Sequence, residues 1–330
     1  IGVGSFFGLS CDADLRNAKQ NLVQIDQGGI CMGERSYYLE DDEATQKVRA
    51  AYRAYGRKRV TLTGKSEAGA AKMMEAVERI ETRIAKASYS RTKLRDVEGN
   101  YHKMTYARLL SDFPGIDWST LFLTQGVPAV EEVSVNQPEP IHEVEKVLEE
   151  CPLEDLKAYL YFNVVDNATG KLSDDFRAAA FEFYSKTMSG AEQDRPRWKR
   201  AVQAVEGVLG MAIGKMYVEK YFPETSKQRM QKLVGDLQIA LGQKIEAQQW
   251  MSAETKARAQ EKLNAFYVKI GYPDEWMSYD ALDIDESLSY YENMARAAKF
   301  RGDYYIERHV NKPVDRTEWL MTPQTINAYY

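Results

Sequence analysis

Residues 195–222 read RPRWKRAVQAVEGVLGMAIGKMYVEKYF. Apolar side chains recur in steps of 4 and 3 residues, at Trp198, Val202, Val205, Leu209, Ala212 and Met216. This spacing places them on one face of an α-helix. Pro223 follows directly, and proline disfavours helical backbone in the residue before it, so the helix is expected to end at Phe222. A long amphipathic helix of this kind needs other elements against which to bury its apolar face.

The same periodicity continues along most of the chain. Residues 225–249, for example, carry an apolar stripe formed by Met230, Leu233, Leu237, Leu241 and Ile245. We predict helices over residues 42–60, 66–88, 105–111, 117–124, 140–150, 153–166, 173–189, 195–222, 225–249, 253–270 and 287–308. Because these stripes have to bury one another, the fold class is mainly α, a multi-helix lobe with small β elements.

The β elements are expected at the two ends of the chain. Within residues 1–40, short apolar runs at 6–9 and 21–25 flank a polar stretch, which indicates a β-hairpin. Residues 131–136 are a candidate for one more strand. Residues 319–330 contain β-branched and aromatic side chains and predict a C-terminal edge strand, which could pair with an extended peptide through main-chain hydrogen bonds.

Composition excludes several classes of protein. The 330 residues carry a net charge of -5, which argues against a nucleic-acid partner. No apolar run reaches the roughly 18 residues that a membrane span requires. The chain shows no signal peptide and begins with Ile1, so we expect it to be processed or cut from a longer protein. Three cysteines without a CxxC motif exclude a disulfide-rich scaffold.

The residues that usually carry chemistry do not form a complete site. The three histidines are His102, His142 and His309. His142 and Glu143 begin a zinc-protease motif, but Lys146 stands where the second imidazole is needed, and a lysine is a cation and not a metal ligand. Serine nucleophile elbows, phosphate loops and Cys/His pairs are also missing from the sequence. We therefore expect no catalytic residue and no metal ligand in this chain.

Several separated stretches nevertheless resemble one family, the neprilysin and endothelin-converting-enzyme family of zinc metallopeptidases, and especially its bacterial oligopeptidase O members. The resemblance runs in order along essentially the whole chain. It rests on IDQGGICMGERSYYL (25–39), YHKMT (101–105), RWKR (197–200), GMAIGKMYVEKYF (210–222), WMSAETKARA (250–259), EKL (261–263), KIGYP (269–273), EW (318–319) and NAYY (327–330).

The resemblance implies a two-lobed zinc endopeptidase that hydrolyses oligopeptides. Residues 1–285 would form the helical, substrate-gating lobe, and residues 286–330 the first helix and edge strand of a thermolysin-like catalytic lobe. Asn327 and Ala328 match the family's Asn-Ala pair, which holds the substrate backbone, and Tyr329 would help to line the pocket before the scissile bond. The zinc ligands and the HExxH segment have no counterpart here, so zinc and a C-terminal catalytic segment of the same protein are implied as cofactor and partner.

Two other classes of function stay open at this point. The chain can act without zinc as a peptide-binding or adhesion module, or serve as a purely structural helical scaffold. By analogy with the family, the protein is expected in the periplasm or at the cell surface of a bacterium, with a cytoplasmic location as the alternative.

Overall fold

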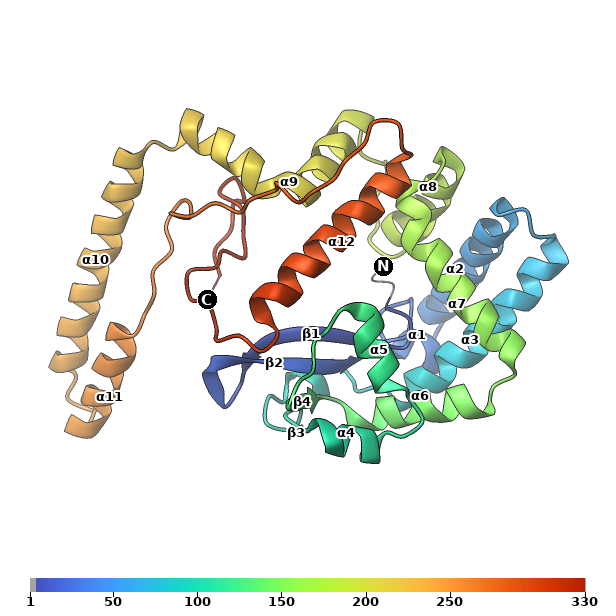
Figure 1. Ribbon diagram of the computed structural model, residues 1–330, viewed down its shortest axis with the longest axis horizontal. Helices are drawn as coiled ribbons and strands as arrows, with labels where there is room; N and C mark the ends of the chain where they lie inside the picture. Colours follow the sequence, from blue (N-terminus) through green and yellow to red (C-terminus); the bar gives the residue numbers. More distant parts are fainter. Residues whose placement is uncertain (1–3, 330) are drawn as a thin grey trace. The chain divides into compact units, whose positions relative to one another are not determined.

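The computed structural model describes residues 4–329, which divide into two compact units (Figure 1). Unit 1 comprises the described residues up to Asp194 together with Leu282–Val314. Unit 2 comprises Arg195–Ala281 and the described residues from Asp315 onward. No helix among the described residues combines the length and the apolar character needed to cross a bilayer.

Unit 1 holds the sheet and most of the helices. Its elements are β1 (Phe7–Asp14), β2 (Asn17–Gln27), α1 (Ser36–Leu39), α2 (Glu43–Leu62), α3 (Glu67–Ala87), η1 (Lys93–Arg95), β3 (Lys103–Thr105), α4 (Tyr106–Asp112), α5 (Trp118–Gln125), β4 (Glu132–Val135), α6 (Pro138–Glu150), α7 (Leu153–Ala168), η2 (Thr169–Lys171), α8 (Asp174–Ala180), the π-helical η3 (Phe181–Thr187) and α12 (Tyr290–His309). Local sequence sets several of the helix starts. The Asp42 carboxylate accepts from the amides of Ala44 and Thr45, and Ser289 forms a capping box with Glu292.

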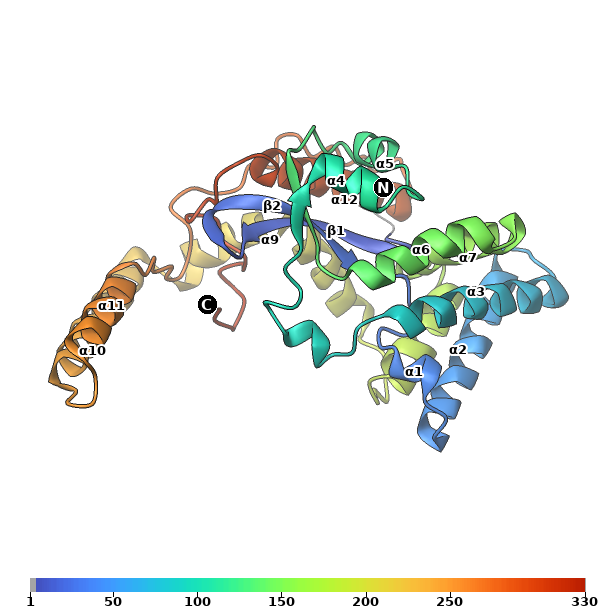
Figure 2. The same ribbon diagram turned by 90° about the horizontal axis from the view of Figure 1, so that it is seen from below.

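The four-stranded sheet has the order β1-β2-β4-β3. β1 and β2 form the predicted antiparallel hairpin, β4 runs parallel to β2, and β3 is antiparallel to β4. The free edge of β1 is covered where α12 crosses it, because the Tyr305 hydroxyl donates to the Cys11 carbonyl at 2.6 Å and accepts from the Cys11 amide at 3.1 Å. Figures 1 and 2 both show α12 beside this hairpin.

Unit 1 has two buried apolar clusters. One lies under the sheet strands and helices α4 and α5 and includes Ile25, Trp118 and Val133. The other lies among α2, α3 and α7, which Figure 2 shows gathered together, and η3, and it includes Tyr52 and Phe162. Both clusters bury the apolar stripes that the helical periodicity predicts in this part of the chain.

A fully buried carboxyl group lies in the second cluster. The hydroxyls of Tyr38 and Tyr52 donate to Glu81 at 2.9–3.0 Å, and the Cys31 amide donates to it at 3.2 Å. Burial raises the pKa of Glu81 from 4.5 to about 7, although these hydrogen bonds favour the charged form and oppose the rise.

Unit 2 contains three helices among its described residues, α9 (Arg197–Tyr221), α10 (Glu224–Ala247) and α11 (Ala253–Asn264). The predicted helix over 253–270 therefore ends earlier than expected. The reason is tertiary, because Arg316 donates to the Ala265 carbonyl at 2.6 Å and Lys269 donates to the Glu318 carbonyl, which holds residues 265–270 as an irregular segment. Ser252 caps α11, and its hydroxyl accepts from the Thr255 amide.

The α10 stripe is not buried by the other residues of unit 2. Met230, Leu233, Leu237 and Leu241 are 41–61 % exposed. The side of α10 that meets α11 is a different one and passes through Gly242, which lies beside Gln260 and Leu263. The expectation that this stripe packs against other helices is therefore wrong within unit 2.

The predicted C-terminal strand is also not formed in the described residues. Residues 319–329 have no strand, and their backbone instead makes local bonds from the Thr325 amide to Thr322 and from the Asn327 amide to Thr325. A strand requires a neighbouring strand with which to pair, and no described segment pairs with this one. Tyr330, the last residue of the predicted strand, lies outside the described residues. The placement of 286–330 in a catalytic lobe stays a prediction.

We expect Glu81 to make the stability of the protein depend on pH. Its folded-state pKa lies above the ordinary value of 4.5, so its contribution is fully present below about pH 4.5 and is lost as the pH rises through about 7. Between about pH 5 and pH 8 the wild-type protein should lose about 2 kcal/mol of unfolding free energy from this group. Glu81→Gln should not show this loss.

Urea unfolding of both proteins at the two pH values measures the effect, because the other titrating groups cancel in the difference between wild type and variant. A difference that stays constant with pH would contradict the assignment.

Candidate functional site

The segment that carries Asn327 and Ala328 is packed against α9 within unit 2. Gly210 and Gly214 are buried and lie one helical turn apart on the same face of α9. A Cβ atom added to Gly210 would lie 2.8 Å from Thr322 Cγ2, and one added to Gly214 would lie 2.6 Å from Pro323 Cδ. Both separations are too short for real atoms, so only glycine allows the segment to approach α9 this closely.

Hydrogen bonds hold the same contact. The Gln324 Nε2 group donates to Glu206 Oε1 at 2.8 Å and to the Gly210 carbonyl at 3.0 Å. The Thr322 hydroxyl donates to the same Glu206 oxygen at 3.4 Å. The helical backbone of α9 is broken at Leu209 (φ -112°, ψ 25°), between Glu206 and Gly210, so the single helix predicted over 195–222 is not continuous there. Glu206, Gly210 and Gly214 all contact the residues from Thr322 to Gln324, and we call these three residues the α9 anchor.

Residues 265–270 hold the segment at a second place. Lys269 donates to the Glu318 carbonyl, and its ammonium lies 5.9 Å from the centre of the Tyr329 ring. The Tyr329 hydroxyl in turn accepts from the Leu320 amide at 3.4 Å. The segment is therefore a turned-back loop whose two ends are tied to each other and to unit 2.

Asn327, Ala328 and Tyr329 are exposed at the surface of this loop. The Asn327 Oδ1 atom accepts from the Ala328 amide at 2.8 Å. Within residues 4–329, neither the Asn327 Nδ2 group nor the Ala328 carbonyl has a hydrogen-bond partner. A side-chain donor and a backbone acceptor in adjacent residues can together bind the main chain of an extended peptide.

In the part of the chain that the structure describes, each histidine lies with too few other ligand-type side chains to hold a metal ion. His142 lies in α6, where its Nδ1 atom is 2.9 Å from Glu145 Oε2 and its ring stacks on Phe113. His309 lies in the last turn of α12, with Nδ1 2.7 Å from the Tyr305 carbonyl. Among the described residues, no group of three or more His, Cys, Asp or Glu side chains could hold a metal ion. The residues in this part of the chain do not fit a zinc site.

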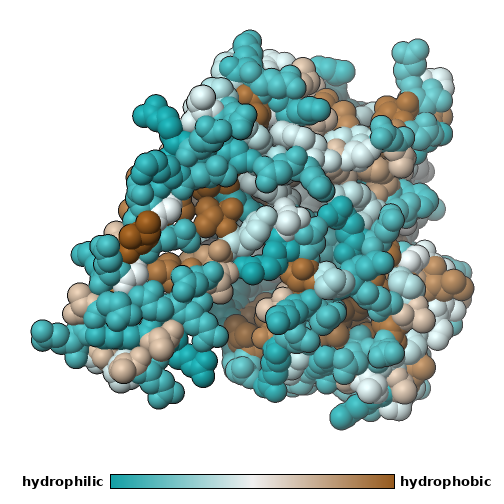
Figure 3. Space-filling model, turned by 60° about the vertical axis from the view of Figure 1, so that its left-hand side comes forward, coloured by the Kyte–Doolittle hydropathy of each residue, from teal (hydrophilic) through white to brown (hydrophobic). Residues whose placement is uncertain are grey.

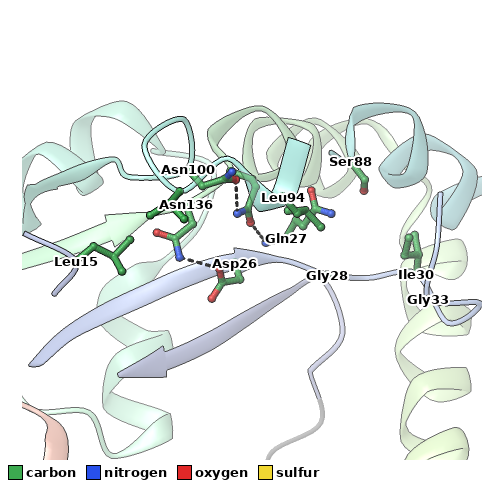
Figure 4. A pocket seen from close by; sticks show the side chains of 12 residues that line it. Leu15, Asp26, Gln27, Gly28, Ile30, Gly33, Ser88, Leu94, Asn100 and Asn136 are labelled. Carbon is green, nitrogen blue, oxygen red and sulfur yellow. Dashed lines mark hydrogen bonds between the residues drawn. The ribbon is translucent and has the colours of Figure 1, made fainter. Parts of the chain in front are cut away.

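A cavity of about 530 Å³ in unit 1 lies between the hairpin and the segment that follows α3 (Figure 4). Its polar side chains bond to one another or to backbone. Gln137 donates to Asn100 at 2.9 Å and accepts from the Gln27 amide at 2.8 Å, and Asn136 donates to Asp26 at 2.8 Å. Because these groups satisfy each other, the cavity is a hydrogen-bonded junction between sheet and loop, and it offers little to a ligand.

The sequence profile described as Peptidase family M13 matches residues 1–273. The chain belongs to peptidase family M13. Endothelin-converting enzyme-like 1 of Mus musculus is 31% identical over 99% of this chain and 43% of its own length. Endothelin-converting enzyme 1 of Homo sapiens is 30% identical over 98% of this chain and 43% of its own length. The predicted resemblance to the neprilysin and endothelin-converting-enzyme family is confirmed.

Solved M13 structures have the same fold. Zinc metalloprotease Zmp1 of Mycobacterium tuberculosis, in its open state, matches 100% of this chain and 51% of its own chain, with a TM-score of 0.90 and 36% identity. PepO from Lactobacillus rhamnosis HN001 matches 98% of this chain and 51% of its own chain with a TM-score of 0.88, and at 21% identity it shows a shared fold. The chain thus spans about half the length of the relatives that it matches.

Sequence reasoning identified the exposed pair and missed what holds it. Asn327 and Ala328 were found through the family motif, whereas Glu206 and Gln324 were not singled out. The one available signal was the pair of glycines at 210 and 214, which stand four residues apart inside a predicted helix, where glycine is unfavourable.

We expect Asn327→Ala to leave the stability of the chain unchanged. The side chain is exposed and bonds only the neighbouring amide, so the free energy of unfolding should change by less than about 0.5 kcal/mol. Urea unfolding of wild type and variant measures this. A larger loss would show that Asn327 supports the fold and would weaken its assignment to a binding site.

Proposed function

We propose that this chain is the part of an M13 zinc metalloendopeptidase that forms one wall of the substrate cleft and binds the backbone of an oligopeptide. Asn327 and Ala328 bind the peptide main chain, and Tyr329 lines the pocket before the scissile bond. The observation that carries the proposal is the exposed Asn327–Ala328 pair, with an unpartnered Nδ2 donor among the described residues, on a loop fixed to α9.

The zinc site belongs to the remaining half of the protein in this proposal. Family M13 includes proteins named zinc metalloprotease, and the chain covers 51% of one of them. Bound zinc would polarise the peptide carbonyl and activate water. The residues of this chain contribute before that step, because they orient the peptide backbone and limit access to short peptides through the helices of residues 1–285. We place the complete protein outside the cytoplasm, in the periplasm or at the cell surface.

Asn327→Ala in the complete, zinc-loaded peptidase should lower kcat/KM for an oligopeptide by about tenfold to a thousandfold, as for the loss of one oriented hydrogen bond in the transition state. Steady-state kinetics with a fluorogenic oligopeptide measures the change, and zinc content checks that the metal site is intact. Kinetics equal to those of wild type would refute the role of Asn327.

The exposed stripe of α10 supports the presence of a further half. Leu233, Leu237 and Leu241 are 49%, 61% and 47% exposed, and they lie on one face of the helix. Figure 3 shows that apolar residues lie at the surface among hydrophilic ones on the face of the chain that it draws. An aligned apolar stripe marks a surface that another protein segment covers. We propose that the remaining half of the peptidase covers it.

The variant Leu237→Glu tests whether the α10 stripe is covered by protein or exposed to solvent in the complete peptidase. In the 330-residue chain it should change the unfolding free energy by less than about 0.5 kcal/mol, because Leu237 is already in contact with water. In the complete peptidase it should cost about 1.5–3 kcal/mol, because a charge then enters an apolar contact. Denaturant unfolding of both proteins measures the two values.

Gln243→Glu is the matched control, since Gln243 is an exposed polar residue on another side of the same helix. It should have a small effect in both proteins. A small effect of Leu237→Glu in the complete peptidase as well would show that its second half does not cover α10.

A further inference from the structure

We infer that the α9 anchor, Glu206, Gly210 and Gly214, together with Gln324, positions Asn327 and Ala328 for substrate binding. These are positioning residues, because none of them is at the exposed surface where the peptide is proposed to bind. The inference rests on the proposed function and extends it to α9, whose anchor residues lie more than 100 positions earlier in the chain than the residues they hold.

The first argument is steric. Gly210 and Gly214 leave no room for a methyl group, since a Cβ at either position would overlap Thr322 or Pro323. Pro323 has a ring with a fixed φ angle, so the chain at this point has little freedom to move aside. A side chain at Gly214 would also lie 2.9 Å from Gln324 Oε1. The glycines therefore fix the depth at which the loop lies on the helix.

The second argument concerns the Gln324 carboxamide. Its Nε2 group donates to both Glu206 and the Gly210 carbonyl, and its Oε1 atom is buried without a partner among the described residues. If the amide turned over, Oε1 would face the Glu206 carboxylate and the Gly210 carbonyl, which are both acceptors. The two acceptors thus determine the orientation of the Gln324 carboxamide. The anchor therefore fixes how the loop is turned on α9, in addition to how closely it approaches the helix.

The link from the anchor to the exposed pair is short and internally bonded. Asn327 follows Gln324 by three residues, a reach of about 10 Å at most. The Thr325 amide donates to the Thr322 carbonyl at 3.0 Å, the two threonine hydroxyls lie 2.8 Å apart, and the Asn327 amide donates to Thr325 at 3.1 Å. A shift at Pro323 is therefore passed on to Asn327. Misplacing a binding group by about 1 Å can cost about a hundredfold in rate.

The test compares two additions of one methyl group to the same helix, in the complete zinc-loaded peptidase. Gly214→Ala should lower kcat/KM for an oligopeptide by at least about tenfold, mostly in kcat, because the anchor acts on transition-state geometry. Gly207→Ala is the control, since a Cβ there meets no atom of residues 4–329 within 4 Å, and it should stay within about twofold of wild type. Zinc content should be the same in both.

A second pair of variants tests the hydrogen bonds and serves if Gly214→Ala does not fold. Glu206→Gln keeps an acceptor oxygen for Gln324 and should retain wild-type kinetics, whereas Glu206→Ala removes the acceptor and should lower kcat/KM by about tenfold. Hydrogen exchange of the backbone amides of residues 325–329 should accelerate in Gly214→Ala and Glu206→Ala and stay unchanged in the two controls.

Combining Gly214→Ala with Asn327→Ala tests whether the anchor acts on kcat/KM through Asn327. If it does, Gly214→Ala should lower kcat/KM by less than about twofold further in that background, because interacting residues are not additive. Two outcomes would overturn the anchor inference and leave the proposed function standing. One is that the losses in kcat/KM of Gly214→Ala and Asn327→Ala are fully additive. The other is that Gly214→Ala and Gly207→Ala have equal kinetics while Asn327→Ala is impaired. Wild-type kinetics for Asn327→Ala would instead overturn the proposed function.

Discussion

The candidate site depends on the close contact between two glycines of α9 and the side chains of Thr322 and Pro323. That contact, together with the bonds that Lys269 and Leu320 make, places the described residues that follow. With the loop seated on the helix, Gln324 reaches its two acceptors, the short turn at Thr325 closes, and Asn327 and Ala328 face outward. No larger side chain fits at Gly210 or Gly214. The close approach of the loop to α9 therefore depends first on the absence of side chains at these two positions, and the hydrogen bonds add to it.

The sequence predicts those parts of the fold that are encoded locally. The hairpin and the helices of unit 1 follow from the spacing of apolar residues that are neighbours in the chain. The predicted C-terminal strand was wrong in the described residues because a strand requires a partner, and periodicity says nothing about partners. The Glu206–Gln324 bond joins residues 118 positions apart, so no local pattern announces it.

The two units differ in how they bury apolar surface. Unit 1 encloses two clusters, one around Ile25 and Trp118 and the other around Tyr52 and Phe162, and it satisfies a buried carboxyl group with two tyrosines and an amide. In unit 2, α10 is long and amphipathic, yet its apolar stripe faces solvent. The residues of unit 2 therefore leave the apolar stripe of α10 uncovered, and the chain spans about half the length of the relatives that it matches.

The tyrosine that crosses β1 has a consequence for self-association. An outer strand with open amides and carbonyls is a template on which a second polypeptide can extend the sheet, and repeated extension produces fibrous aggregates. The Tyr305 hydroxyl occupies both main-chain groups of Cys11, in the middle of β1. A strand from another molecule would have to displace α12 before it could pair with β1. The Tyr305 side chain therefore protects the hairpin from forming a continuous sheet with other copies of the chain.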